Sequence, residues 1–208
     1  MKRTVDVQMP AMRTKNTIRT LLAIMAALPV LAWAHAGHGQ GGHEGLLAGF
    51  LHPLAGADHL AAMLAVGLWT ALAARRGRAD LVLAPLGFVA LLLTGALMTH
   101  AGLVLPAVEP LVAASLLVLG LLVALRAQWP LPWVLPLVGV FGFFHGAAHG
   151  SEVGGLPALA GMVLGSVLLH AVGVVVGLVV RNRSVWLPRV AGAGIGLIGS
   201  ALLVGLAR

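Results

Sequence analysis

Long apolar runs constrain this chain more than any other feature. Hydrophobic residues make up 60% of its 208 residues and charged residues only 9%, and it has no Cys. Soluble domains average about 25% charged residues, and one membrane-spanning helix needs about 20 mostly apolar residues. We therefore expect an all-α fold, a polytopic helix bundle embedded in the lipid bilayer, with no soluble domain.

The first 34 residues have the pattern of a secretory signal peptide. A basic leader precedes an apolar stretch from Leu21 to Ala34, which ends in the A-x-A cleavage signal of residues 32–34. An uncleaved first transmembrane helix is the alternative, but an apolar run of about 14 residues is short for a span. Cleavage would make His35 the amino terminus and leave residues 35–45 as a short His- and Gly-rich periplasmic segment.

Residues 46–208 are expected to form a single domain of six transmembrane helices. The apolar blocks run from about Leu46 to Ala74, Leu81 to Val104, Leu111 to Leu125, Leu131 to Gly150, Leu156 to Val180 and Val190 to Leu206. Arginines occur only in the first, third and fifth connections, which the positive-inside rule makes cytoplasmic. Both mature termini then face the periplasm of a bacterial inner membrane. The basic residues indicate topology, and we expect no nucleic-acid partner.

Glycines recur at four-residue spacing in the last two apolar blocks. The pairs are Gly161/Gly165, Gly173/Gly177 and Gly192/Gly196. This spacing is typical of transmembrane helices that approach each other closely. The GxGxxG pattern that begins at Gly194 has no strand before it and no acidic residue after it, so we expect no nucleotide or other organic cofactor.

The first apolar block contains His52, Asp58 and His59, which is costly inside a membrane. On one continuous helix the two histidines would stand about 10 Å apart and could not bind one ion together. Pro53 and Gly56 allow the backbone to bend, and a broken helix is a recurring way to build an ion site at membrane depth. Asp58 is either a metal ligand or a group that orients an imidazole.

The fourth block ends in His145 and His149, followed by Glu152. The spacing of four and then three residues places all three on one helical face within two turns. Two imidazoles and a carboxylate at this spacing predict a divalent metal site. Hydrogen bonding of the histidines to neighbouring helices is the alternative. With no Cys in the chain, imidazole and carboxylate suit Ni²⁺ and Co²⁺, and this ligand chemistry leaves Zn²⁺ open.

The segments His52-Pro-Leu-Ala-Gly-Ala-Asp58-His59 and Phe144-His145-Gly-Ala-Ala-His149-Gly-Ser-Glu152 resemble, in this order, the two signatures of the HupE/UreJ family. The resemblance spans nearly all of the chain after the leader. It implies a nickel or cobalt permease, not an enzyme, often associated with supplying hydrogenase or urease. It also implies metal contact for His52, Asp58, His59, His145, His149 and Glu152.

Three further histidines and two other function classes stay open. The freed amine and imidazole of His35 could capture metal, and His100 and His170 could extend an ion path. An intramembrane metallohydrolase is one rival, but the HExxH arrangement is missing. A metal-binding sensor or assembly subunit is the other. The metal identity, the oligomeric state, the driving force and the direction of transport are left open by the sequence.

Overall fold

The computed structural model describes residues 45–74 and 78–208. The expected signal peptide and His35 lie outside the described residues. The described part consists of seven helices: α2 (Leu46–Ala55), α3 (Ala57–Ala73), α4 (Arg78–His100), α5 (Val108–Leu125), α6 (Leu131–His149), α7 (Leu156–Val180) and α8 (Trp186–Leu206). Helices α4 to α8 are each long and apolar enough to cross a membrane, and α2 with α3 can form a sixth span. The prediction of an all-α membrane bundle is confirmed.

The first apolar block is divided into α2 and α3, which meet at an angle of 84°. Pro53 lies in the last turn of α2, and Gly56 between the two helices is extended, with φ −88° and ψ 122°. Proline removes one backbone hydrogen-bond donor and glycine is a weak helix former, so the chain can change direction here. His52 and His59 therefore lie on two different helix axes, as the sequence suggested.

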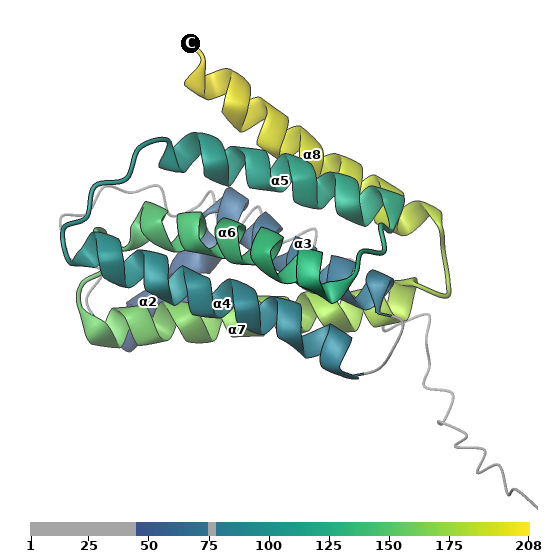
Figure 1. Cartoon of the computed structure of the whole chain (residues 1–208), viewed down its shortest axis with the longest axis horizontal. Coiled ribbons are helices and arrows are strands. Elements are labelled where there is room, and N and C mark those ends of the chain that lie inside the picture. Colours follow the sequence, from purple (N-terminus) through teal and green to yellow (C-terminus); the bar gives the residue numbers. More distant parts are fainter. Residues whose placement is uncertain (1–44, 75–77) are drawn as a thin grey trace, which may run out of the picture.

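The helices pack mainly in pairs, α4 with α6, α5 with α8, and α7 with both α2 and α3. Figure 1 shows α4, α6 and α7 side by side, with α5 and α8 stacked above them and the C-terminus projecting from the bundle. Helices α4 and α6 end, and α7 begins, at one end of the bundle, which we call the histidine end. Helices α5 and α7 finish at the opposite end, which we call the arginine end, where the Arg126 guanidinium donates to the carbonyl of Arg181 over 2.8 Å.

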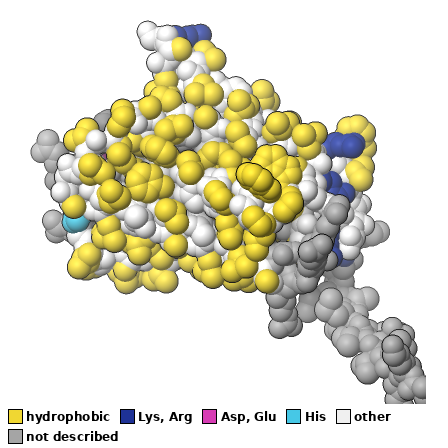
Figure 2. Space-filling model, in the orientation of Figure 1, with side chains coloured by type: hydrophobic (Ala, Val, Ile, Leu, Met, Phe, Trp, Pro, Cys, Tyr) yellow, Lys and Arg dark blue, Asp and Glu magenta, His cyan; other side chains and the backbone are white. Residues whose placement is uncertain are grey.

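Hydrophobic side chains spread over the face of the bundle seen in Figure 2, with other side chains and backbone between them and arginines only near its ends. Trp129, Trp133 and Trp186 are 49%, 71% and 68% exposed, and all three lie close to the arginine end. The Arg189 guanidinium lies over the Trp186 ring, 5.2 Å from its centroid. Exposed tryptophans and arginines at the same level are typical of a membrane–water interface. The chain is thus a membrane protein, with an interface at the arginine end.

Glycines bring α7 against the broken span. A side-chain carbon at Gly161 would overlap the carbonyl of Leu46, and one at Gly173 would overlap that of Leu64. A carbon at Gly165 would come within 2.9 Å of the Pro53 ring. Helix α7 therefore follows α2 and then α3 through its glycines, which confirms the close packing expected from their spacing.

Replacing Gly161 with Ala should lower the thermal unfolding midpoint in detergent by several degrees, because the new methyl group would force α2 and α7 apart. Overpacking of this kind costs about 1–3 kcal/mol. Gly194→Ala is the matched control, since nothing lies within 4 Å of that position and alanine favours the helix. Equal midpoints for the two variants would show that the close approach does not contribute to stability.

Candidate metal centre

Four histidine rings from three helices meet at the histidine end. The His149 ring, at the end of α6, lies with its centroid 4.5 Å from that of His52 on α2 and 4.1 Å from that of His59 on α3. The His59 ring also lies 4.7 Å from the His145 ring. The bend between α2 and α3 makes this possible, because it lets His52 and His59 approach the same imidazole from two sides.

Glu152 joins this group from outside the helix. Helix α6 ends at His149, and Glu152 lies in the turn that follows. The expectation that His145, His149 and Glu152 share one helical face is wrong for Glu152, because α6 ends at His149 with Gly150 as its C-cap. The turn still returns the carboxylate to His149, whose Nδ1–H donates to Oε2 over 2.7 Å.

The hydrogen bonds of His59 and His149 leave two nitrogen lone pairs facing each other. A backbone carbonyl only accepts, so Nε2 of His59 carries a proton and donates to the carbonyl of His145 over 3.2 Å. His149 uses its Nδ1 proton on Glu152. In the neutral imidazoles, His59 Nδ1 and His149 Nε2 are then both unprotonated, 3.3 Å apart. Asp58 Oδ1 adds a third acceptor 3.1 Å from His59 Nδ1. A proton or a bound cation between these acceptor atoms would remove the repulsion among their lone pairs.

The spacing of these lone pairs suits a transition metal. Two nitrogens bound to one tetrahedral ion at about 2.0–2.1 Å lie about 3.3 Å from each other, which matches the 3.3 Å between His59 Nδ1 and His149 Nε2. A second group of possible ligands consists of His52, His149 and Glu152, with one ligand atom from each lying within 4.8 Å of the others. His149 belongs to both groups and is the centre of the site.

Burial increases steadily from the surface into the cluster. The Glu152 side chain is 56% exposed, that of His149 22% and that of His59 3%. His145, one turn before His149 on α6, is 0% exposed. A cation could therefore meet a solvated carboxylate first and then exchange its waters for imidazole nitrogens one step at a time.

The backbone around the cluster also favours a cation. The C-terminal ends of α2 and α6 lie at Ala55 and His149, and such ends carry partial negative charge. Asp58 lies in the first turn of α3, where its carboxylate accepts the backbone N–H of His59 over 2.8 Å. Asp58 is thereby held beside the imidazole, as expected either for a ligand or for a group that orients one.

Of the remaining candidate histidines, the two that the structure describes lie apart from this group. His100, at the end of α4, donates from Nδ1 to the carbonyl of Gly150 over 3.3 Å. His170 lies in the middle of α7 and is 2% exposed. Its ring packs on Phe88, 5.1 Å between centroids, and Phe88 also lies 5.5 Å from the His145 ring. No sequence pattern singled out Phe88 as a neighbour of these histidines, because it is one apolar residue among many in an apolar helix.

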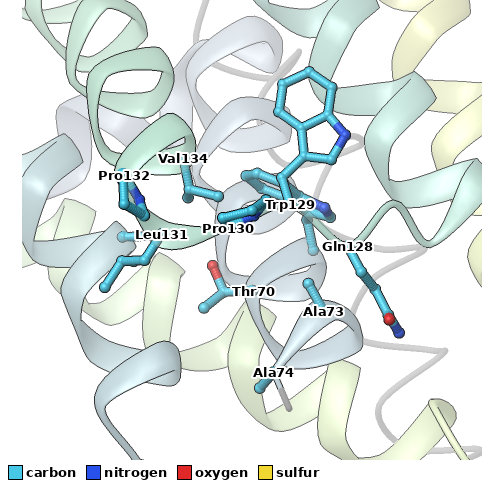
Figure 3. Close-up of a pocket in the computed structure, with 11 residues that line it drawn as sticks. Thr70, Ala73, Ala74, Gln128, Trp129, Pro130, Leu131, Pro132 and Val134 are labelled. Carbon is cyan, nitrogen blue, oxygen red and sulfur yellow. The ribbon is translucent and has the colours of Figure 1, made fainter. Parts of the chain in front are cut away.

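A cavity of about 420 Å³ opens at the arginine end, far from the cluster. Figure 3 shows it between Thr70 and Ala73 of α3 and the Gln128, Trp129 and Pro130 segment before α6. Thr70 is eleven residues beyond His59 on α3, or about 16 Å along the axis. The sequence held no signal for this cavity, because its walls come from segments that only the fold brings together.

Comparison with known proteins gives one family. A model of the family described as HupE / UreJ protein matches residues 22–202. The chain is 38% identical over 195 residues to "Protein HupE" of Rhizobium leguminosarum bv. viciae, an alignment that covers 91% of this chain and 98% of that protein. No solved structure matches the chain.

Proposed function

Because the chain belongs to the HupE/UreJ family, with residues 22–202 matched, we propose that it is a permease that takes up Ni²⁺ or Co²⁺ across the bacterial inner membrane. The observation that carries this proposal is the convergence of imidazoles from α2, α3 and α6 at one end of an apolar bundle. Ionisable residues grouped at the ends of apolar membrane helices are costly and indicate a functional site, and the lone pairs of this group are arranged for a cation.

Each ligand has a place in the proposed path. Glu152 attracts the hydrated ion, and His52 and His149 bind it with that carboxylate. The ion then moves between His149 and His59, where Asp58 balances part of its charge. His145 lies beyond His59, fully buried, and receives the ion after His59.

The ligand types restrict the cargo. Imidazole nitrogen with few carboxylates suits Ni²⁺, Co²⁺ and Zn²⁺, whereas Mg²⁺ and Ca²⁺ prefer oxygen ligands. The order of affinities places Ni²⁺ above Co²⁺ for a given site. The chain carries the metal as substrate, with no organic cofactor and no chemical reaction of its own. Supply of a nickel enzyme such as hydrogenase or urease is the proposed physiological role.

The arginine end faces the cytoplasm in the proposed topology. The arginines there support this orientation by the positive-inside rule, and the exposed tryptophans support a membrane–water interface at that level. The histidine end and the carboxyl terminus then face the periplasm. Cleavage after Ala34 places His35, with its free amine, on the periplasmic side as an early contact for metal.

Flux into proteoliposomes tests the proposal. The purified protein, reconstituted without partners, should carry Ni²⁺ or Co²⁺ at least tenfold faster than protein-free vesicles do, and Ca²⁺ at the background rate. Zn²⁺ measured in parallel would identify the cargo. Metal binding without flux in sealed vesicles would contradict the permease and favour a sensor or assembly subunit of the membrane.

A further inference from the structure

Two histidines in the bundle interior present unused nitrogen lone pairs. His145 is 0% exposed and His170 2% exposed. The Nδ1–H of His145 donates to the carbonyl of Phe141 over 2.8 Å, and that of His170 donates to the carbonyl of Ser166 over 2.6 Å. Because a carbonyl only accepts, both rings have the same tautomer, with an unprotonated Nε2. Among the described residues, neither Nε2 has a hydrogen-bond partner.

This arrangement is the one that metal-binding histidines adopt. A histidine ligand usually donates its second ring N–H to a carbonyl or carboxylate, which orients the ring and keeps the other nitrogen free for the metal. Two buried acceptors of this kind, both left without a donor, are unfavourable unless something occupies the space beside them. If these two positions only filled space in the interior, leucine or phenylalanine would fill it without leaving a buried polar atom unpaired.

The two rings lie in sequence along the axis of the bundle. His145 is four residues before His149, about 6 Å deeper along α6. The Phe88 ring lies 5.5 Å from the His145 ring and 5.1 Å from the His170 ring between centroids, so both imidazoles neighbour the same aromatic side chain. The carbonyl of His170 abuts Gly67, which is eight residues or about 12 Å beyond His59 on α3.

His170 also lies close to the level of the cavity. Gly67, against its backbone, comes three residues before Thr70, and Thr70 lines the cavity at the arginine end. Helix α7 contains no Asp, Glu, Lys or Arg, so His170 is its one ionisable side chain. His149, His145 and His170 thus form a descending series between the surface cluster and the cavity.

We propose that His170 is a metal ligand in the bundle interior, which takes the ion from His145 through its Nε2 and passes it toward the cavity lined by Thr70. This inference rests on the proposed function, since it extends the path of the same cation. The part of the path at His170 offers imidazole nitrogen, and α7 supplies no carboxylate. This part would therefore reject Mg²⁺ and Ca²⁺ even if the surface cluster admitted them.

His170→Asn removes Nε2 while keeping an amide that can donate to the carbonyl of Ser166. In proteoliposomes its Co²⁺ flux should fall at least tenfold, while Co²⁺ binding at the surface cluster stays within threefold of the unaltered protein. Leu169→Ala is the control, because it removes a buried neighbour that is 4% exposed and has no lone pair. Its flux should stay within threefold.

A second variant allows a measurement that changes only if the side chain at position 170 binds the metal, and not if it merely packs. His170→Cys introduces the only thiol of a Cys-free chain, and thiolate prefers softer metals. Loading with Cd²⁺ should produce a Cd²⁺–thiolate ultraviolet band, and the ratio of Cd²⁺ to Co²⁺ flux should rise at least threefold. Leu169→Cys should show neither change.

The outcomes separate the two proposals. Absence of flux in the unaltered protein would contradict the permease itself. Normal flux in the unaltered protein and in His170→Asn, or equal losses in His170→Asn and Leu169→Ala, would overturn the ligand role of His170 and leave the permease standing. Absence of the Cd²⁺–thiolate band in His170→Cys would also overturn it.

Discussion

Replacing His149 with Ala should abolish metal flux and weaken Co²⁺ binding by at least about 100-fold, more than the 10–100-fold typical of losing a supporting partner. No other described residue contacts His52, His59 and Glu152 together. Removing the His149 imidazole takes one ligand from each of the two candidate groups and also leaves the Glu152 carboxylate without its hydrogen-bond partner. Flux in proteoliposomes and calorimetric titration with Co²⁺ would measure the two effects.

His100→Ala is the matched control for this prediction. His100 is also at the histidine end, but its ring donates to the carbonyl of Gly150 and lies outside the cluster. We expect its flux to stay within threefold. If His100→Ala abolished flux and His149→Ala did not, the ion path would run along α4, and the site described above would be the wrong one.

Asp58→Asn should lower flux about 100-fold with little change in thermal stability. Asparagine has nearly the shape of aspartate but lacks its charge, and Asp58 Oδ1 lies 3.1 Å from the His59 nitrogen that faces His149. At a separation of about 4 Å and an effective dielectric constant of about 20, one unit charge contributes on the order of 4 kcal/mol. The Asp58 side chain is 31% exposed, so solvent reduces that value.

The control for Asp58→Asn is Glu109→Gln, which removes a carboxylate in the first turn of α5 at the same end of the bundle. Its flux should stay within twofold. Equal losses in the two variants would mean that the negative charge of the whole surface attracts the ion, and that Asp58 has no particular place in the path. Retained flux in Asp58→Asn alone would restrict Asp58 to orienting His59.

The proposed path grows drier and poorer in carboxylates with depth. Glu152 and Asp58 are partly exposed, whereas His145 and His170 are almost fully buried. A divalent ion loses water progressively along such a path, and imidazole replaces it. Hard cations, which exchange water for nitrogen poorly, would be held at the surface.

Much of the architecture followed from the sequence. The apolar blocks located the helices from α4 to α7 with errors of a few residues at their ends, because a span must be long and apolar whatever its neighbours are. Pro53 and Gly56 correctly indicated the break in the first apolar block, because their effect on the helix is local. The expected start of the last helix, Val190, was four residues late, because Trp186 and Leu187 already belong to α8.

The family resemblance also followed from local patterns, and the match over residues 22–202 confirms it. The two motifs carry their candidate ligands within short segments, so no knowledge of the fold was needed to notice them. The placement of Glu152 on the helix was wrong because the i, i+3 spacing looks the same in a helix and in the turn that ends one. The ligand roles of all these residues remain predictions.

The sequence by itself determined that this protein is a membrane bundle, where its spans lie, where the first one breaks and which residues could bind metal, since each property depends on neighbours in the chain. Only the tertiary structure decided that His149 stands between His52 and His59, that the lone pairs of His59 and His149 face each other, and that Phe88 joins His145 to His170. Those contacts connect residues up to 97 positions apart. Their geometry depends on how glycines let whole helices approach, which no local pattern records.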